Sequence, residues 1–310
     1  MRIIFMGTPD FALPSLKTLL DSEHTVAAVI TQPDRPKGRG QHLTPPPVKV
    51  MAEAAGVPVR QPQKMKDPAF LADLTHLNPD LIVVVAFGRI LPPSILQTPR
   101  QGCINVHASL LPQYRGAAPI AWAIIHGKKQ TGITTIQMDE GLDSGAILLQ
   151  ETTEIIPSDT AGTLGIRLSE IGARVLLKTV DGIVTGTLKP IPQDHTQVTF
   201  APLLDKDQGR VNWSLSANEI SNVVRGFDPW PTAYTFYHKD RWKLWNAAAR
   251  DVAVKEKPGT ILKVGKEGIE VATGDGVLAI HELQPSNARR MSIKEYLAGH
   301  AVQEGIILEK

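Results

Sequence analysis

The chain has almost no cysteine, because Cys103 is its one thiol. A single cysteine excludes an intrachain disulfide and any zinc cluster built on cysteine ligands. Cys103 lies in an apolar segment, and we interpret it as a small core residue. No apolar run is long enough for a transmembrane helix, and Met1–Gly7 is predicted as a strand without the cleavage region of a signal peptide. These absences favour a cytoplasmic protein with no membrane association.

An excess of charge is also missing, since cations outnumber carboxylates by only two. That balance is too small to indicate a nucleic-acid-binding protein by itself. A hydrophobic content of 42% and a charged content of 21% are typical of a globular protein. The length of 310 residues favours two domains.

The first part of the chain alternates strands with helices. A strand at Arg2–Met6, a helix at Phe11–Leu20 and a strand at Val26–Thr31 predict a right-handed βαβ unit and a parallel sheet. Asp80–Ala86 is nearly all apolar, as expected for a central strand covered on both faces. The first turn lacks the G-x-G-x-x-G fingerprint, which disfavours a dinucleotide cofactor. We therefore expect an α/β domain with a Rossmann-like, mostly parallel sheet over residues 1–188.

The last third of the chain has a different pattern. Residues 189–206 contain three prolines among polar residues and are predicted to be a linker. Short strands separated by glycine and charged turns then predict a smaller, OB-like β-barrel over residues 207–310. The expected strands are Thr235–His238, Lys243–Ala248, Gly259–Val264, Gly268–Ala272 and Gly276–Leu283.

One segment of the first domain, Gln32–Pro47, is rich in proline and glycine and carries three closely spaced cations. Such a segment buries little apolar surface, so we predict a mobile loop. Its composition alone favours a solvated linker. The alternative is an arm that contacts phosphates.

The candidate site lies where two predicted strands end. Asn105 and His107 are two residues apart in the strand Cys103–His107 and therefore share a face. A second strand, Ile133–Met138, leads into a loop that contains Asp143. An amide, an imidazole and a carboxylate can polarise a carbonyl group, hold an oxyanion and move a proton. Each residue also has an ordinary interpretation, as a turn former, a core histidine or a turn aspartate.

Two motifs favour the catalytic interpretation. The stretch His107–Pro119 reads H-x-S-L-L-P-x-x-x-G-A-x-P, and Gly132–Leu148 includes Asp-Ser-Gly. Both resemble the signatures of the formyltetrahydrofolate-dependent transformylases, in the right order. The chain as a whole is similar to the branch of that family that formylates methionyl-tRNA. The resemblance implies transfer of a formyl group from 10-formyltetrahydrofolate, a cosubstrate, to the α-amino group of methionine on initiator methionyl-tRNA.

The same resemblance implies roles for individual residues. Asn105 and His107 would donate to the oxyanion, and Asp143 would hold His107 and accept the proton lost by the amine. No metal and no obligate protein partner are expected. The folate contacts implied are Phe87, Gly88, Ile90, Leu91, Ser109, Leu110, Leu111, Pro112, Asp139 and Gly141. The tRNA contacts implied are Arg35, Lys37, Arg39 and His42.

Four alternatives remain open. A related enzyme could formylate a sugar-nucleotide amine, and a non-catalytic RNA-binding protein could use the same fold. Ser109 could form a hydrolase triad with His107 and Asp143, although no G-x-S-x-G elbow is present. A zinc site at His107 and Asp143 would need a third ligand, for which no spacing motif exists.

Overall fold

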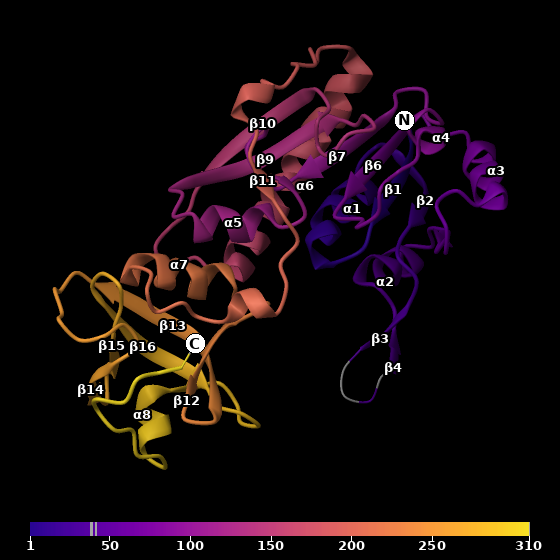
Figure 1. Ribbon diagram of the computed structural model, residues 1–310. Helices are drawn as coiled ribbons and strands as arrows, with labels where there is room; N and C mark the ends of the chain where they lie inside the picture. The colour runs from indigo at the N-terminus through magenta and orange to yellow at the C-terminus, as the bar shows by residue number, and fades with distance from the viewer. Residues whose placement is uncertain (38–39, 41, 310) are drawn as a thin grey trace. The chain divides into compact units, whose positions relative to one another are not determined.

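The computed structural model describes residues 1–37, 40 and 42–309, which form two compact units (Figure 1). The first unit comprises Met1–Pro119, Gln130–Glu154 and Gly165–Ala201. The second comprises Ile120–Lys129, Ile155–Leu164 and Pro202–Lys310.

The first unit is built on a seven-stranded sheet with the order β10-β9-β7-β6-β1-β2-β5. Neighbouring strands from β5 to β7 run parallel, and β9 is antiparallel to both β7 and β10. The prediction of a mostly parallel sheet is therefore confirmed. The strands are β1 (Arg2–Gly7), β2 (Thr25–Ile30), β5 (Val59–Arg60), β6 (Leu81–Val85), β7 (Cys103–His107), β9 (Gln130–Gln137) and β10 (Ile147–Glu154).

Helices cover both faces of this sheet. On one face, Leu74 of α3 and Ile95 of α4 pack in a cluster with Met6, Val84 and Cys103. On the other face, α6 lies over β7 and β9, where Thr179 and Thr135 share a hydrogen bond of 2.8 Å. No helix in the described part of the chain is long and apolar enough to cross a bilayer. The helices are α1 (Leu13–Leu20), α2 (Pro47–Ala54), α3 (Pro68–His76), α4 (Pro93–Leu96) and α6 (Ala161–Thr185).

The segment predicted as a mobile loop, Gln32–Pro47, contains a short hairpin. Strand β3 (Arg35–Lys37) pairs antiparallel with β4 (His42–Thr44). Composition misses this hairpin because backbone hydrogen bonds can form without buried apolar side chains. The base of the hairpin is held at Asp34, which accepts hydrogen bonds from Gln61 and Lys49 that lower the pKa of its carboxyl group.

The segment predicted as a linker makes regular contacts with the first unit as far as Ala201. We call Lys189–Ala201 the return segment. Ile191 exchanges two backbone hydrogen bonds of 2.8 Å with Ile147, at the start of β10. Strand β11 (Phe200–Ala201) pairs parallel with β8 (Arg115–Gly116). The return segment thus lies against the loops that follow β7 and β9.

The second unit contains an antiparallel sheet with the order β12-β13-β16-β15-β14, and β17 pairs with β16. The C-terminal segment Gly305–Glu309 hydrogen-bonds to both ends of this order. Glu309 exchanges hydrogen bonds with Phe236 of β12, and Leu308 donates to Gly259, just before β14. The strands are β12 (Ala233–Tyr237), β13 (Asp240–Arg250), β14 (Ile261–Gly265), β15 (Gly268–Ala272), β16 (Val277–Gln284) and β17 (Met291–Ser292).

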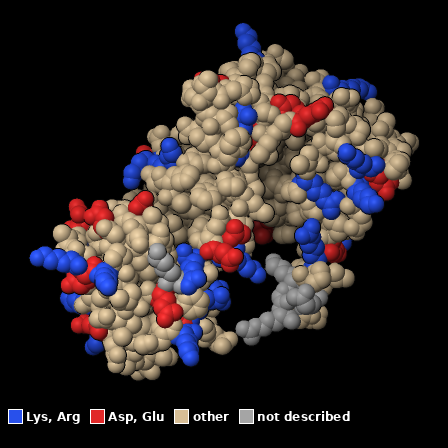
Figure 2. Space-filling view, in the orientation of Figure 1, with Lys and Arg blue, Asp and Glu red and all other residues tan. Residues whose placement is uncertain are grey.

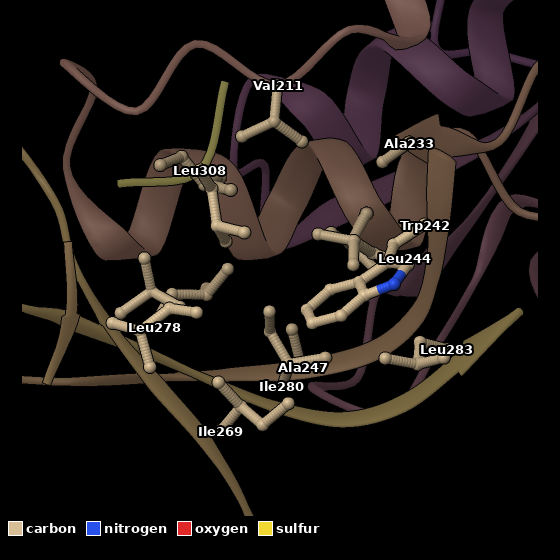
Figure 3. Close-up of a cluster of buried hydrophobic side chains, with 14 of the residues drawn as sticks. Val211, Ala233, Trp242, Leu244, Ala247, Ile269, Leu278, Ile280, Leu283 and Leu308 are labelled. Atoms are coloured by element: carbon tan, nitrogen blue, oxygen red, sulfur yellow. The ribbon is translucent and has the colours of Figure 1, made fainter. Parts of the chain in front are cut away.

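The core of the second unit lies between this sheet and helix α7 (Ala217–Gly226) (Figure 3). The indole of Trp242 is fully buried there and stacks on Tyr237 at 4.7 Å between ring centroids. A capping box formed by Ser216 and Glu219 begins α7 and stabilises a helix by about 1 kcal/mol. Two short helices complete the unit, α5 (Pro119–Ile125) and α8 (Ile293–Leu297).

Candidate active site

The structure brings the three predicted catalytic side chains together at the end of β7. The side-chain amide of Asn105 donates to Oδ1 of Asp143 at 3.2 Å. The Nδ1 atom of His107 lies 3.6 Å from Oδ2 of the same carboxylate. His107 and Asp143 are largely buried, with 6% and 15% of their side chains exposed. An amide, an imidazole and a carboxylate therefore meet in one partly enclosed place.

The tautomer of His107 follows from its other contact. Its Nε2 lies 2.9 Å from the carbonyl oxygen of Tyr114, which can only accept a hydrogen bond, so Nε2 carries a hydrogen. In a neutral ring, Nδ1 then presents a lone pair to Asp143. The contact becomes an ion pair when the ring is protonated; at 3.6 Å it is longer than a hydrogen bond.

The backbone around the site is held in unusual conformations. Tyr114 and Asp143 have positive φ angles of 60° and 47°, which cost a non-glycine residue about 1–3 kcal/mol and cluster at functional sites. The backbone N–H of Gly116 donates to Oδ2 of Asp143 at 2.9 Å. At Gly145, a Cβ atom would lie 1.7 Å from the carbonyl oxygen of Gln137, so glycine alone fits.

Sequence reasoning missed Gln193, which lies beside this loop. Its Nε2 donates to the carbonyl oxygens of Asp143 and Gly145, each at 2.8 Å. Its Oε1 accepts from Arg115. Arg115 lies inside the first motif, but its role there was not predicted. Gln193 lies in a proline-rich segment with no periodic pattern, so the sequence gives no signal for it.

Four of the predicted folate contacts lie on the loop after β6, next to β1, where the strand order reverses. This position is the usual ligand site of an open α/β sheet. The carbonyl oxygen of Phe87 accepts from the side-chain amide of Gln32 at 3.1 Å, and Gly88 follows with a φ of 76°. Ile90 is 85% exposed, whereas Leu91 is buried.

The remaining predicted folate contacts lie on the loops that follow β7 and β9. Asp139 accepts from the backbone N–H of Gly141 at 3.0 Å and from Ser144. Ser109 is fully buried and donates to the carbonyl oxygen of Gln113 at 2.6 Å. The other three residues follow Ser109 in the chain: Leu110, Leu111 and Pro112.

The hydrolase and zinc alternatives lack the geometry they need. A hydrolase triad requires a hydrogen bond from the serine to the histidine, but Ser109 and His107 each bond a backbone carbonyl instead. Within residues 1–37, 40 and 42–309, no third metal ligand accompanies His107 and Asp143. Ligand atoms within 4.8 Å of one another do occur elsewhere, at Glu23, His24 and Asp181.

Three of the predicted tRNA contacts lie on the β3–β4 hairpin. Arg35 and His42 are both exposed there, one on each strand. The backbone of Lys37 pairs with His42. Arg39 lies outside the described residues.

The second unit carries three arginines stacked over aromatic rings. Arg210 lies 5.7 Å from the ring centroid of Phe236, Arg241 lies 5.5 Å from that of Tyr234, and Arg290 lies 5.0 Å from that of Trp245. We call these six residues the aromatic–arginine surface. Lys and Arg are interspersed with Asp and Glu on the visible face of this unit (Figure 2). On this face, positive charge is therefore confined to individual side chains and does not form a continuous patch.

Comparisons with known proteins agree over the whole chain. Residues 1–180 match the family described as Formyl transferase, and residues 203–301 match Formyl transferase, C-terminal domain. The chain is 51% identical over 308 residues to the methionyl-tRNA formyltransferase of Alkaliphilus oremlandii (strain OhILAs), with 99% of both chains covered. It is also 51% identical to that of Acetivibrio thermocellus over 309 residues, again with 99% of both covered.

Solved structures share the fold. The N-formyltransferase from Helicobacter canadensis, in complex with folinic acid and dTDP-3-aminofucose, has a TM-score of 0.70 at 18% identity, with 94% of this chain and 100% of that chain covered. HypX from Aquifex aeolicus, in complex with tetrahydrofolic acid, has a TM-score of 0.65 at 19% identity, with 96% of this chain and 47% of that chain covered. At these identities the likeness concerns the fold.

Proposed function

The chain belongs to the methionyl-tRNA formyltransferase family, and we propose that it formylates the α-amino group of methionine on initiator methionyl-tRNA for translation initiation. The formyl donor is 10-formyltetrahydrofolate. The observation that carries this proposal is the cluster of Asn105, His107 and Asp143 in a chain that is 51% identical to such enzymes over 308 residues. A protein active in translation initiation belongs in the cytoplasm.

The substrate supplies its own nucleophile, so the protein has to stabilise charge and move protons. The amine nitrogen attacks the formyl carbon, whose oxygen becomes negatively charged. Asn105 uses one amide hydrogen on Asp143, which leaves the second hydrogen for this oxyanion. When the tetrahedral intermediate collapses, the bond from the formyl carbon to the folate nitrogen breaks, and that nitrogen takes the proton that the His107–Asp143 pair received from the amine. Removing one oxyanion donor typically lowers kcat by about 10²–10³.

The proton of the amine goes to the His107–Asp143 pair. Nδ1, whose lone pair faces the carboxylate 3.6 Å away, would take this proton; the protonated ring then forms an ion pair with Asp143 and can donate from Nδ1. The oxyanion would accept a hydrogen bond from a ring nitrogen of His107. Nε2 is engaged by Tyr114, so Nδ1 performs this role in the proposed mechanism. Every step uses side chains and substrate groups, and none requires a metal.

The folate site is proposed between the loops that follow β6, β7 and β9. Folate would contact Phe87, Gly88, Ile90, Leu91, Ser109, Leu110, Leu111, Pro112, Asp139 and Gly141. Ser109 is fully buried, with its hydroxyl bound to Gln113 and its carbonyl oxygen to Thr134, so its part would be to hold the loop that presents Leu110–Pro112. The position of these loops at the strand-order reversal supports the proposal.

The tRNA would be bound by both units. Arg35, Lys37 and His42 on the hairpin, together with Arg39, would contact the acceptor end. The aromatic–arginine surface would contact a more distant part, because guanidinium groups bind phosphates and aromatic rings stack on bases. We propose residues 1–188 as a Rossmann-like catalytic domain, 189–206 as the connection, and 207–310 as an OB-like β-barrel. The bonds of Gly305–Glu309 to both ends of the strand order support the barrel.

The proposal is tested by assaying formyl transfer from 10-formyltetrahydrofolate to three acceptors. These are charged initiator tRNA, charged elongator tRNA and a sugar-nucleotide amine. We expect the initiator tRNA to have the highest kcat/KM. Preferential formylation of the sugar-nucleotide amine would contradict the assignment, and an inactive protein that still binds tRNA would support the RNA-binding alternative.

A further inference from the structure

We propose that Gln193 is a positioning residue for Asp143, and that the return segment is therefore a working part of the active site. This inference rests on the function proposed above and adds a residue to it. Gln193 uses both hydrogens of its amide on the loop that contains Asp143, at 2.8 Å to the carbonyl oxygens of Asp143 and Gly145. Only 6% of Gln193 is exposed, so water has little access to replace these bonds.

The other end of the Gln193 side chain is fixed as well. Its Oε1 accepts from Nε and Nη2 of Arg115 at 3.1 and 2.6 Å. Arg115 is itself buried, with 6% exposed, and it lies in β8, which pairs with β11 of the return segment. The amide is therefore held in one orientation, with its two N–H groups directed at the catalytic loop.

Asp143 needs such support because its backbone is left-handed, with a φ of 47°. The bond from Gln193 fixes the peptide group that follows Asp143. The N–H of Gly116, also in β8, fixes the carboxylate at 2.9 Å. Main chain and side chain of Asp143 are thus both held by the return segment and the strand paired with it. A small rotation at Asp143 would move its carboxylate away from His107.

A single substitution separates this role from simple packing. Gln193→Glu keeps the size of the side chain and its acceptors for Arg115, so the buried guanidinium keeps a partner. It removes both N–H donors and places a carboxylate oxygen against two carbonyl oxygens, which repels the loop. Gln197→Glu is a matched control, because Gln197 lies on the same segment, is exposed, and bonds Asp194 instead.

The experiment compares the full-length wild type, Gln193→Glu and Gln197→Glu. For Gln193→Glu we expect kcat to fall by about 100-fold, with the KM values for folate and tRNA changed by less than about twofold. Hydrogen exchange at the Gly116 amide, followed by NMR, should become faster because its acceptor has moved. Gln197→Glu should match the wild type in both measurements.

An unchanged kcat for Gln193→Glu, or an unchanged exchange rate at Gly116, would overturn the proposal. The exchange measurement needs no substrate. If the wild type itself transferred no formyl group to tRNA, the proposed function would fail, and the exchange rate at Gly116 would still decide whether Gln193 positions Asp143.

Discussion

At the scale of single residues, the site depends on backbone conformations that most side chains avoid. Tyr114 and Asp143 both contact His107 and both have positive φ angles. Aspartate and asparagine tolerate this conformation better than most residues do. The identity of residue 143 is therefore constrained twice, by its chemistry and by its backbone.

Asp143→Asn should fold normally but lose most of its activity. Asparagine tolerates the left-handed backbone, and its side-chain oxygen can still accept from Gly116. It cannot take up a proton or pair with a protonated His107, so we expect kcat to fall by about 10²–10⁴. Steady-state kinetics and thermal unfolding measure the two effects. Glu140→Gln, an exposed change in the same loop, is the control; near-wild-type turnover in folded Asp143→Asn would refute the role.

Cys103 should be almost unreactive in the folded protein. Burial raises the pKa of its thiol to about 12, from an ordinary value of 9.0. At pH 8 the thiolate fraction is then lower by about a thousandfold than in the unfolded chain. Alkylation with iodoacetamide, followed by mass spectrometry with and without denaturant, measures this difference. Equal rates in both conditions would show that the thiol is accessible.

The same shift gives a pH dependence with a defined sign. Above about pH 9 the unfolded chain loses the thiol proton while the folded chain keeps it, so the free energy of unfolding falls as pH rises towards about 12. Cys103→Ala lacks this contribution. Urea titrations of both proteins measure this effect. The difference between their free energies of unfolding should be constant below pH 9. Above pH 9, the free energy of unfolding of the wild type should fall relative to that of Cys103→Ala.

At the scale of elements, the helices and strands that bury a continuous apolar face could be predicted from the sequence. The strands Cys103–His107 and Gly268–Ala272 were predicted with the bounds that β7 and β15 have. Longer elements were found with ends shifted by a few residues; Phe11–Leu20, for example, begins with a 3₁₀ turn before α1. Strands β8 and β11 have two residues each, which is too short for any periodicity.

The candidate site could be predicted only in part for the same reason. Asn105 and His107 lie in an apolar strand, and His107 and Asp143 lie inside recognisable motifs. Gln193 reaches the site through β8–β11 pairing and a bridge at Ile191. These contacts are tertiary, and nothing in the local sequence encodes them.

The β3–β4 hairpin should contribute to tRNA binding through charge. Arg35→Ala removes one exposed cation and should weaken tRNA binding, lowering the slope of log affinity against log salt by about one. The KM for folate should not change. Filter binding across a salt series measures the slope. Lys66→Ala, which removes an exposed cation from a loop outside the hairpin, controls for net charge; an equal effect of both changes would contradict a specific hairpin contact.

At the scale of the whole molecule, the chemistry is proposed to lie in the first unit, and part of the tRNA recognition in the second. The catalytic residues all belong to the first compact unit, and the aromatic–arginine surface belongs to the second. Binding energy from a remote part of a substrate can serve to orient its reacting end. Changes in the second unit should therefore act on tRNA and leave folate unaffected.

The double change Tyr234→Ala and Arg241→Ala tests this division. Loss of one stacking ring and one guanidinium should weaken tRNA binding by about 10- to 100-fold without altering the KM for folate. Arg250→Ala is the control, because Arg250 in the same sheet is already paired with Glu270. Unchanged tRNA affinity in the double variant would move the binding surface elsewhere.

The C-terminal segment Gly305–Glu309 covers the two edge strands of the sheet in the second unit. Strand edges with free N–H and C=O groups are templates for pairing with another chain. By bonding to Phe236 and to Gly259, this segment covers both ends of the strand order at once. If this segment detached, both edges of the sheet would be exposed together, and a strand of a neighbouring molecule could pair with either edge. We therefore expect removal of these five residues to promote aggregation and strand exchange.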